Sequence, residues 1–87
     1  MERNFLIKNQ LGLHARAAGK WVQLSNEFES QLTIQFDGQE VDGKSILNVL
    51  TLACPMGREI TVRAEGQDAA QLLNALERLV EEKFGED

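Results

Sequence analysis

Gly12-Leu13-His14-Ala15-Arg16 is the stretch around which this chain is organised, because a strand-like run changes to a helix-like run here. The stretch holds the one histidine of the chain. Apolar residues follow it at the three- and four-residue spacing of a helix with one buried face, namely Ala17, Ala18, Trp21, Leu24 and Phe28. The spacing predicts a helix that begins at or just after His14 and ends around Asn26.

The start of this helix is suited to bind an anion. The first turn of a helix leaves backbone N–H groups without partners, and the helix dipole adds partial positive charge there. Ala15, Arg16 and Ala17 supply those amides, and the Arg16 guanidinium adds a fixed charge whose shape suits phosphate. A histidine at this place can carry a phosphoryl group on nitrogen. The residues alone leave a second reading open, in which His14 only caps a helix.

A family resemblance separates the two readings. Residues 12–18, GLHARAA, resemble the active-site signature of the HPr family, the histidine-containing phosphocarriers of the bacterial phosphotransferase system. Residues 43–47, GKSIL, resemble the regulatory serine segment of that family, and residues 56–79 fit its last strand and helix. The resemblance therefore covers essentially the whole chain. Ala17 departs from it, since the family usually has proline there, but alanine is the best helix former and the turn should still form.

The resemblance implies the chemistry. His14 would accept a phosphoryl group on Nδ1 from phosphorylated Enzyme I and pass it to EIIA-type domains. Arg16 and the amides of residues 15–17 would stabilise the phosphoryl oxygens. The protein would then be a carrier cycled by other enzymes, not an enzyme itself, and it would need no cofactor. Ser45 matches the serine that a dedicated HPr kinase/phosphorylase modifies in some bacteria, and it is also the expected N-cap of a short helix.

That short helix, residues 45–52, provides the predicted docking surface. It is apolar almost all round, and a fold of 87 residues cannot bury every side of it. The resemblance implies that Ile46 and Leu47 meet Enzyme I and the receiving domains. The alternative is that these two pack inwards and leave Val49 and Leu50 exposed.

Gly19 and Lys20 complete this predicted docking surface. Gly19 costs helix stability, which either the close approach of a partner or local packing would explain. Lys20 belongs to a mildly basic front half of the chain, together with Arg3, Lys8, Arg16 and Lys44. This charge is compatible with docking of an acidic partner near His14.

Composition excludes several classes of function. The formal net charge of −5 argues against nucleic-acid binding, which needs a basic face. One cysteine, Cys54, excludes an internal disulfide, and with one histidine it provides no metal site. No apolar run has the length of a membrane span, and the first residues lack the apolar stretch of a signal peptide. We therefore expect a cytoplasmic protein with no direct membrane insertion and one domain, residues 1–87. A monomer is the default expectation for a carrier that must present its site to successive partners.

The remaining pattern predicts an α+β fold. Alternating apolar residues predict strands over residues 3–8, 31–36, 39–41 and 59–64, with Asp37-Gly38 as a two-residue hairpin turn. A last helix should begin at Asp68, which forms a capping box with Gln71, and end near Gly85. The carboxylates near the end, Glu77, Glu81, Glu82, Glu86 and Asp87, are interpreted as a solvated face.

The element order is then β-α-β-β-α-β-α, which predicts an antiparallel sheet covered on one face by three helices. This pattern alone also permits a ferredoxin-like arrangement. The resemblance favours the HPr-like open-faced two-layer sandwich, with strand order 1-4-2-3.

Three alternatives for the function remain. A nitrogen-branch, NPr-like carrier would serve regulation instead of sugar uptake, and Ala17, Asn48 and the acidic ending are compatible with it. A pure regulator would act through modified Ser45 and the docking surface, with His14 idle. A small metabolite-binding α+β domain would need a pocket, which the sequence does not indicate.

Overall fold

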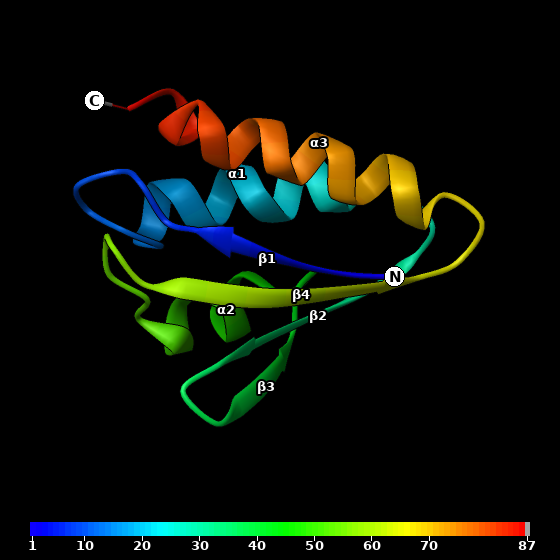
Figure 1. The fold of residues 1–87 in the computed structure, drawn as a ribbon, viewed down its shortest axis with the longest axis horizontal. Coiled ribbons are helices and arrows are strands. Elements are labelled where there is room, and N and C mark those ends of the chain that lie inside the picture. Colours follow the sequence, from blue (N-terminus) through cyan, green and yellow to red (C-terminus); the bar gives the residue numbers. More distant parts are fainter. Residues whose placement is uncertain (87) are drawn as a thin grey trace.

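A computed structural model describes residues 1–86 and shows a four-stranded antiparallel sheet with three helices (Figure 1). The strands are β1 (Glu2–Leu6), β2 (Gln31–Phe36), β3 (Gln39–Asp42) and β4 (Glu59–Glu65), and they lie in the order β1-β4-β2-β3. The helices are α1 (Ala15–Ser25), α2 (Ile46–Leu52) and α3 (Ala69–Glu81), followed by a short 3-10 turn, η1 (Lys83–Gly85). The predicted element order and strand order are confirmed.

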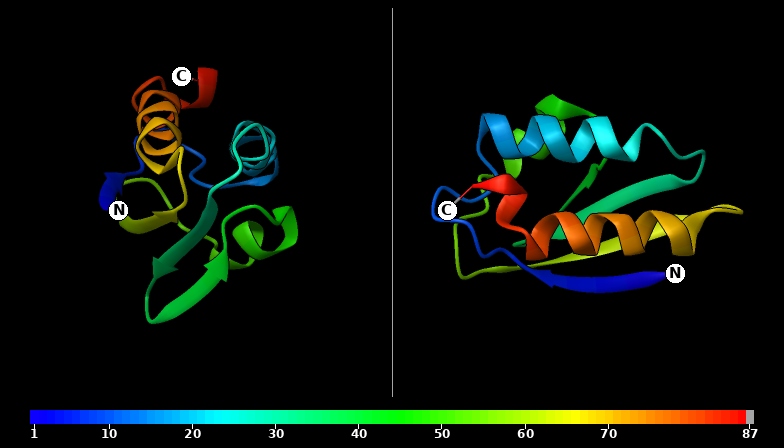
Figure 2. Two further views of the ribbon diagram at one scale, coloured as in Figure 1. Left: turned by 90° about the vertical axis from the view of Figure 1, so that its right-hand side faces the viewer. Right: turned by 90° about the horizontal axis from the view of Figure 1, so that it is seen from above.

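The helices lie on one face of the twisted sheet. Helices α1 and α3 lie side by side above it, and α2 lies next to β3 and α1 (Figures 1 and 2). Both figures also place η1, drawn in red, beside the loop that joins β1 to α1. This arrangement brings the last residues close to the first turn of α1.

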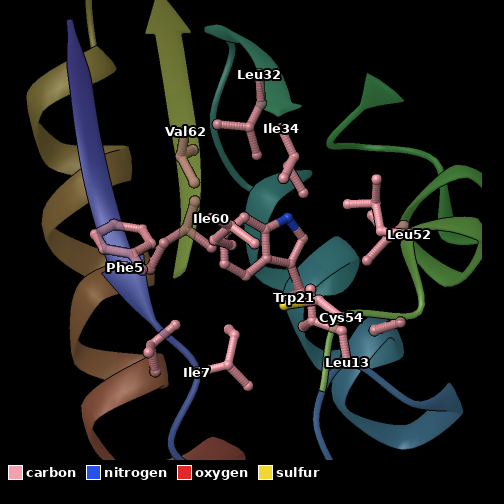
Figure 3. Close-up of a cluster of buried hydrophobic side chains, with 14 of the residues drawn as sticks. Phe5, Ile7, Leu13, Trp21, Leu32, Ile34, Leu52, Cys54, Ile60 and Val62 are labelled. Atoms are coloured by element: carbon pink, nitrogen blue, oxygen red, sulfur yellow. The ribbon is translucent and has the colours of Figure 1, made fainter. Parts of the chain in front are cut away.

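The core holds α1 firmly on the sheet. Inward-facing side chains come from every second position of β1, β4 and β2, as the alternation predicts, and Figure 3 shows them around Trp21. The Trp21 ring meets Phe5 edge-on, with 6.2 Å between ring centroids, and its Nε1 donates a hydrogen bond to the Gly43 carbonyl at 3.0 Å. Trp21 is completely buried, as are Ala17 and Ala18 on the same helix face. The position of the α1 N-terminus is therefore fixed by packing.

The hairpin and the second helix follow the prediction. Asp37 and Gly38 form the turn between β2 and β3 with φ of 51° and 79°, the left-handed values that such a turn requires. Helix α2 begins after Ser45, which is its N-cap.

The predicted capping box at the start of α3 is wrong. Asp68 is the N-cap, but its backbone, with φ −103° and ψ 24°, is not extended, and its side chain caps no amide of α3. The carboxylate instead accepts hydrogen bonds from the backbone amides of Glu29 and Ser30, at 2.9 and 3.0 Å, and from the Ser30 hydroxyl. These bonds hold the pKa of the Asp68 carboxyl below its usual range, the Ser30 hydroxyl contributing most. Asp68 therefore ties the loop before β2 to α3.

The end of the chain also differs from the prediction. Helix α3 ends at Glu81 instead of continuing to Gly85, because Lys83 and Phe84 adopt left-handed φ of 56° and 57°. Phe84 is completely buried. Asp87 of the predicted acidic face lies outside the described residues.

Candidate functional site

His14 is the N-cap residue of α1, as predicted. Its backbone is extended, with φ −81° and ψ −175°, and its carbonyl accepts the first bond of the helix from Ala18 N at 2.8 Å. Its side chain makes no capping hydrogen bond and is 28% exposed. His14 therefore occupies the N-cap position without capping α1 through its side chain.

The loop before His14 is clamped against the segment that follows α2. Gly12 has a φ of 69°, and a Cβ atom at this position would overlap the Cys54 carbonyl oxygen. Leu13 N donates a hydrogen bond to that same oxygen at 2.9 Å, and the Leu13 side chain is buried. These contacts fix the direction in which the chain enters α1. They explain why glycine and an apolar residue precede the histidine.

The first turn of α1 offers donors on the surface. The amides of Ala15, Arg16 and Ala17 precede the first hydrogen-bonded N–H of the helix, that of Ala18. The Arg16 side chain is exposed. A surface hollow here is lined by Gln10, Leu11, His14, Ala15, Arg16, Gly85 and Glu86. The hollow thus brings together the predicted His14, Ala15 and Arg16, whereas Ala17 is completely buried and does not line it.

One further residue, Glu86, contacts His14, and a second, Asn9, holds Glu86; the sequence indicated neither. Oε2 of Glu86 lies 2.7 Å from His14 Nε2, and Oε1 of the same carboxylate accepts a hydrogen bond from Asn9 Nδ2 at 3.0 Å. Asn9 is completely buried and also donates to the Gly12 carbonyl at 2.8 Å. The interpretation of Glu86 as part of a solvated face is therefore wrong. The sequence did not indicate this, because Glu86 belongs to a run of carboxylates whose other members, Glu77, Glu81 and Glu82, are exposed.

The Glu86 carboxylate is held ionised. Burial raises the pKa of the Glu86 carboxyl, but the hydrogen bonds with Asn9 and His14 and the charges of His14 and Arg16 outweigh burial and lower that pKa below its usual value. At neutral pH the ionised Glu86 carboxylate therefore lies at hydrogen-bond distance from Nε2 of the His14 imidazole.

The predicted docking residues lie on the surface. Ile46 and Leu47 are 42% and 72% exposed, whereas Val49 is buried. The alternative with these two packed inwards is wrong. Ser45, as expected for an N-cap, accepts a hydrogen bond from the Asn48 amide, at 3.5 Å.

Gly19 and Lys20 have local contacts. A Cβ at Gly19 would lie 3.8 Å from Ile46 Cδ1, an ordinary van der Waals distance, so packing within the chain does not require glycine there. The Lys20 ammonium donates a hydrogen bond to the Phe84 carbonyl at 2.6 Å. Lys20 therefore fastens the end of the chain to α1.

Residues 1–86 contain neither a metal-binding cluster nor a membrane-spanning helix. No cluster of three or more His, Cys, Asp or Glu side chains there has the arrangement of a metal site. None of the helices in that part of the chain combines the length and apolar character of a membrane span.

Comparison with known proteins agrees with this site. The family model described as "PTS HPr component phosphorylation site" matches residues 1–82. The phosphocarrier protein HPr of Xylella fastidiosa is 42% identical over 87 residues, covering 100% of this chain and 98% of that protein. The phosphocarrier protein NPr of Shewanella violacea is 43% identical over 86 residues, covering 99% of this chain and 94% of that protein.

A solved structure extends the agreement to the fold. The crystal structure of HPr-C-His from Thermoanaerobacter tengcongensis has a TM-score of 0.96 and 39% sequence identity, and the match covers 100% of this chain and 98% of that one. The sequence match over residues 1–82, the shared fold and full-length relatives named HPr and NPr give one conclusion. This chain belongs to the HPr family, the phosphocarriers of the phosphotransferase system, which are not catalysts themselves.

Proposed function

We propose that His14 carries the phosphoryl group, accepting it on Nδ1. The observation that carries this proposal is the position of the imidazole. It stands at the N-cap of α1, partly exposed, with Nε2 engaged by Glu86, so that Nδ1 is the nitrogen left for phosphorus. A single nucleophilic nitrogen beside helix-terminal amides is what reversible phosphoryl transfer needs.

The environment supports the phosphoryl oxygens without enclosing them. The amides of Ala15 and Arg16 and the exposed Arg16 side chain can donate to the anionic oxygens, while the open hollow lets a partner reach the phosphorus. These groups would hold the phosphoryl oxygens only by hydrogen bonds and charge. The N–P bond is then the one covalent bond that must break when the phosphoryl group is transferred. The phosphoryl group can therefore leave as readily as it arrived.

The partners are those that membership of the family implies, Enzyme I as donor and EIIA-type domains as acceptors. The surface formed by Ile46, Leu47, Gly19 and Lys20 is proposed as their docking site. Its two apolar side chains are exposed, and Gly19 lies under Ile46 on the neighbouring helix. Exposed apolar side chains beside a reactive group are typical of protein interfaces.

Ser45 is proposed as a regulatory phosphorylation site for an HPr kinase/phosphorylase. It lies at the start of α2, directly before the two apolar docking residues. A phosphate there is compatible with the helix dipole but adds negative charge and a desolvation cost to the docking surface. Modification of Ser45 would then weaken docking without unfolding α2.

A nitrogen-branch role is the second candidate, because an NPr protein, at 43% identity, is about as similar to this chain as an HPr protein at 42%. Both candidates use the same chemistry on His14 and differ in the acceptor. Transfer from the phosphorylated protein to purified sugar-branch and nitrogen-branch EIIA domains, measured side by side, distinguishes them.

The decisive experiment incubates the protein with Enzyme I and phosphoenolpyruvate and follows it by phosphorus NMR and intact mass. We expect one added, acid-labile phosphate with the chemical shift of a phosphohistidine. The His14→Ala variant should remain unmodified. An unmodified wild-type protein, or a modified His14→Ala variant, would overturn the assignment.

A further inference from the structure

The carboxylate of Glu86 is unusually well fixed for a residue so near the end of a chain. Its two oxygens have separate partners, His14 Nε2 at 2.7 Å and Asn9 Nδ2 at 3.0 Å, and the side chain is only 12% exposed. Asn9 cannot turn away easily, because it is buried and its Nδ2 also donates to the Gly12 carbonyl. The carboxylate is thus held by a rigid donor on one side and faces the imidazole on the other.

The backbone that delivers Glu86 is strained. Lys83, Phe84 and Gly85 have φ of 56°, 57° and 74°, and only the glycine adopts this region without steric cost. The buried Phe84 ring and the hydrogen bond from Lys20 to the Phe84 carbonyl hold this turn in place. Glu86 N also donates to the Lys83 carbonyl at 2.9 Å. Backbone strain of this kind is commonly found at functional sites.

A carboxylate at this distance determines which nitrogen carries the imidazole proton. An ionised carboxylate only accepts hydrogen bonds, so the nitrogen that faces it must be the N–H of the neutral ring. The other nitrogen then has the free lone pair. For His14 the protonated nitrogen is Nε2 and the nucleophilic one is Nδ1.

We propose that Glu86 is a positioning residue for phosphoryl transfer: it keeps the proton of His14 on Nε2 throughout the cycle and so reserves Nδ1 for phosphorus. This inference rests on the proposed function of His14. Asn9 holds Glu86 in place, and the turn of residues 83–85 delivers it.

The step balances without any proton transfer. The Nδ1 lone pair of His14 forms a bond to phosphorus while the bond from phosphorus to the donor atom of phospho-Enzyme I breaks, and that electron pair stays on the donor. The ring gains positive charge because Nε2 keeps its proton, and the Glu86 carboxylate neutralises this charge at hydrogen-bond distance. In the reverse direction the acceptor attacks phosphorus and the ring leaves as neutral imidazole, still protonated on Nε2.

The test compares Glu86→Ala and Glu86→Gln with the control Glu82→Gln. Glu82 lies four positions earlier, is exposed and loses the same charge, but its side chain faces no part of the site. Long-range nitrogen–proton NMR of the unphosphorylated protein reports the tautomer of His14, and rapid-quench measurements report its phosphorylation by phospho-Enzyme I.

In the wild type and in Glu82→Gln we expect the proton on Nε2 and equal rates. In Glu86→Ala the Nδ1-protonated tautomer should become populated and the rate should fall about tenfold, the lower end of what the loss of a hydrogen-bond partner costs a metal-binding histidine. Glu86→Gln keeps one acceptor oxygen and should lie between the two. An unchanged tautomer and rate in Glu86→Ala would overturn the inference, as would an equal loss in Glu82→Gln.

This experiment separates the two proposals. A wild-type protein that Enzyme I does not phosphorylate on His14 removes the proposed function, whatever the tautomer. Normal phosphorylation of the Glu86→Ala variant removes only the role of Glu86. A fall in melting temperature without a change of tautomer would show that Glu86 only fastens the chain end, and it would count against the proposal.

Discussion

Helices α1 and α2 begin in opposite ways. At α2 the N-cap Ser45 turns its hydroxyl to the helix and accepts a hydrogen bond from the Asn48 amide. At α1 the N-cap His14 turns its ring away from the helix, to Glu86, and leaves the first-turn amides without a side-chain cap. Where the N-cap side chain accepts a hydrogen bond from a first-turn amide, that amide is no longer available to a ligand. Where no side chain does so, the first-turn amides can bind an external anion. The start of α1 is therefore open in a way that the start of α2 is not.

Helix α3 shows a third solution. Asp68 stands at its N-cap but bonds with Glu29 and Ser30 of another loop. An acidic N-cap would repel a phosphate, so this start cannot serve as an anion site either. Each of the three helix starts can be altered by one substitution, and the effects should differ in size and kind.

The largest effect is expected at the entry to α1. Gly12→Ala places a methyl group on a residue with φ of 69°, over the Cys54 carbonyl and 2.9 Å from Pro55 Cα. The left-handed backbone and the overlap with main-chain atoms should together lower the free energy of unfolding by about 3 kcal/mol. For a domain of this size we expect the melting temperature to fall by more than about 10 °C, measured by calorimetry.

Gly38→Ala is the matched control for this prediction. Gly38 has a similar φ of 79°, but a Cβ there would meet nothing within 4 Å. It should therefore cost only the backbone term, about 1 kcal/mol. Equal losses in the two variants would mean that the close contact with the segment after α2 does not fix the entry to α1.

A smaller, pH-dependent effect is expected at α3. In Asp68→Asn the side chain loses its charge and one of its two acceptor oxygens, so the melting temperature should fall by a few degrees at neutral pH. Because the folded-state pKa of Asp68 lies below its usual value, its contribution to stability is present above the ordinary carboxyl pKa. That contribution is lost as pH falls through the lowered pKa.

The difference in melting temperature between wild type and Asp68→Asn should therefore shrink on acidification. Glu65→Gln, a change at an exposed carboxylate on β4, should show a small difference at every pH. A difference for Asp68→Asn that stays constant down to strongly acidic pH would contradict the assigned hydrogen bonds.

The sequence pattern correctly predicted the structural features that depend on residues close together in the sequence. The period of two in the strands, the Asp37-Gly38 turn and the N-cap positions of His14 and Ser45 all follow from local spacing and propensity. The family resemblance added the strand order, which local pattern alone left open.

The wrong predictions concern residues whose partners lie far along the chain. Asp68 matches a capping-box pattern, but its partners are Glu29 and Ser30, about 40 residues earlier. The sequence around Glu86 is typical of a solvated acidic segment, but Glu86 contacts His14, 72 residues earlier. The left-handed turn of residues 83–85 places it there, and no local sequence pattern predicted that turn. The sequence thus predicted His14 and Arg16 as members of the candidate site, and did not predict the Glu86 carboxylate that contacts His14.

The smallest effect is expected at α2. Ser45→Ala removes the acceptor of the Asn48 amide and leaves this helix start open, as α1 already is. The bond is long, at 3.5 Å, and the amide can turn to water, so the loss should be about 0.5 kcal/mol, at the low end for an N-cap. Urea unfolding measures it, and Ser45→Asp should keep the stability because an aspartate also accepts the bond and suits the helix dipole. A loss for Ser45→Ala as large as that for Gly12→Ala would contradict this prediction and show that α2 depends strongly on its cap.

The same two variants test whether the start of α2 takes part in phosphoryl transfer. If His14 is phosphorylated at the wild-type rate in both, then neither the open helix start in Ser45→Ala nor the added charge in Ser45→Asp affects the transfer, and the anion site is confined to α1.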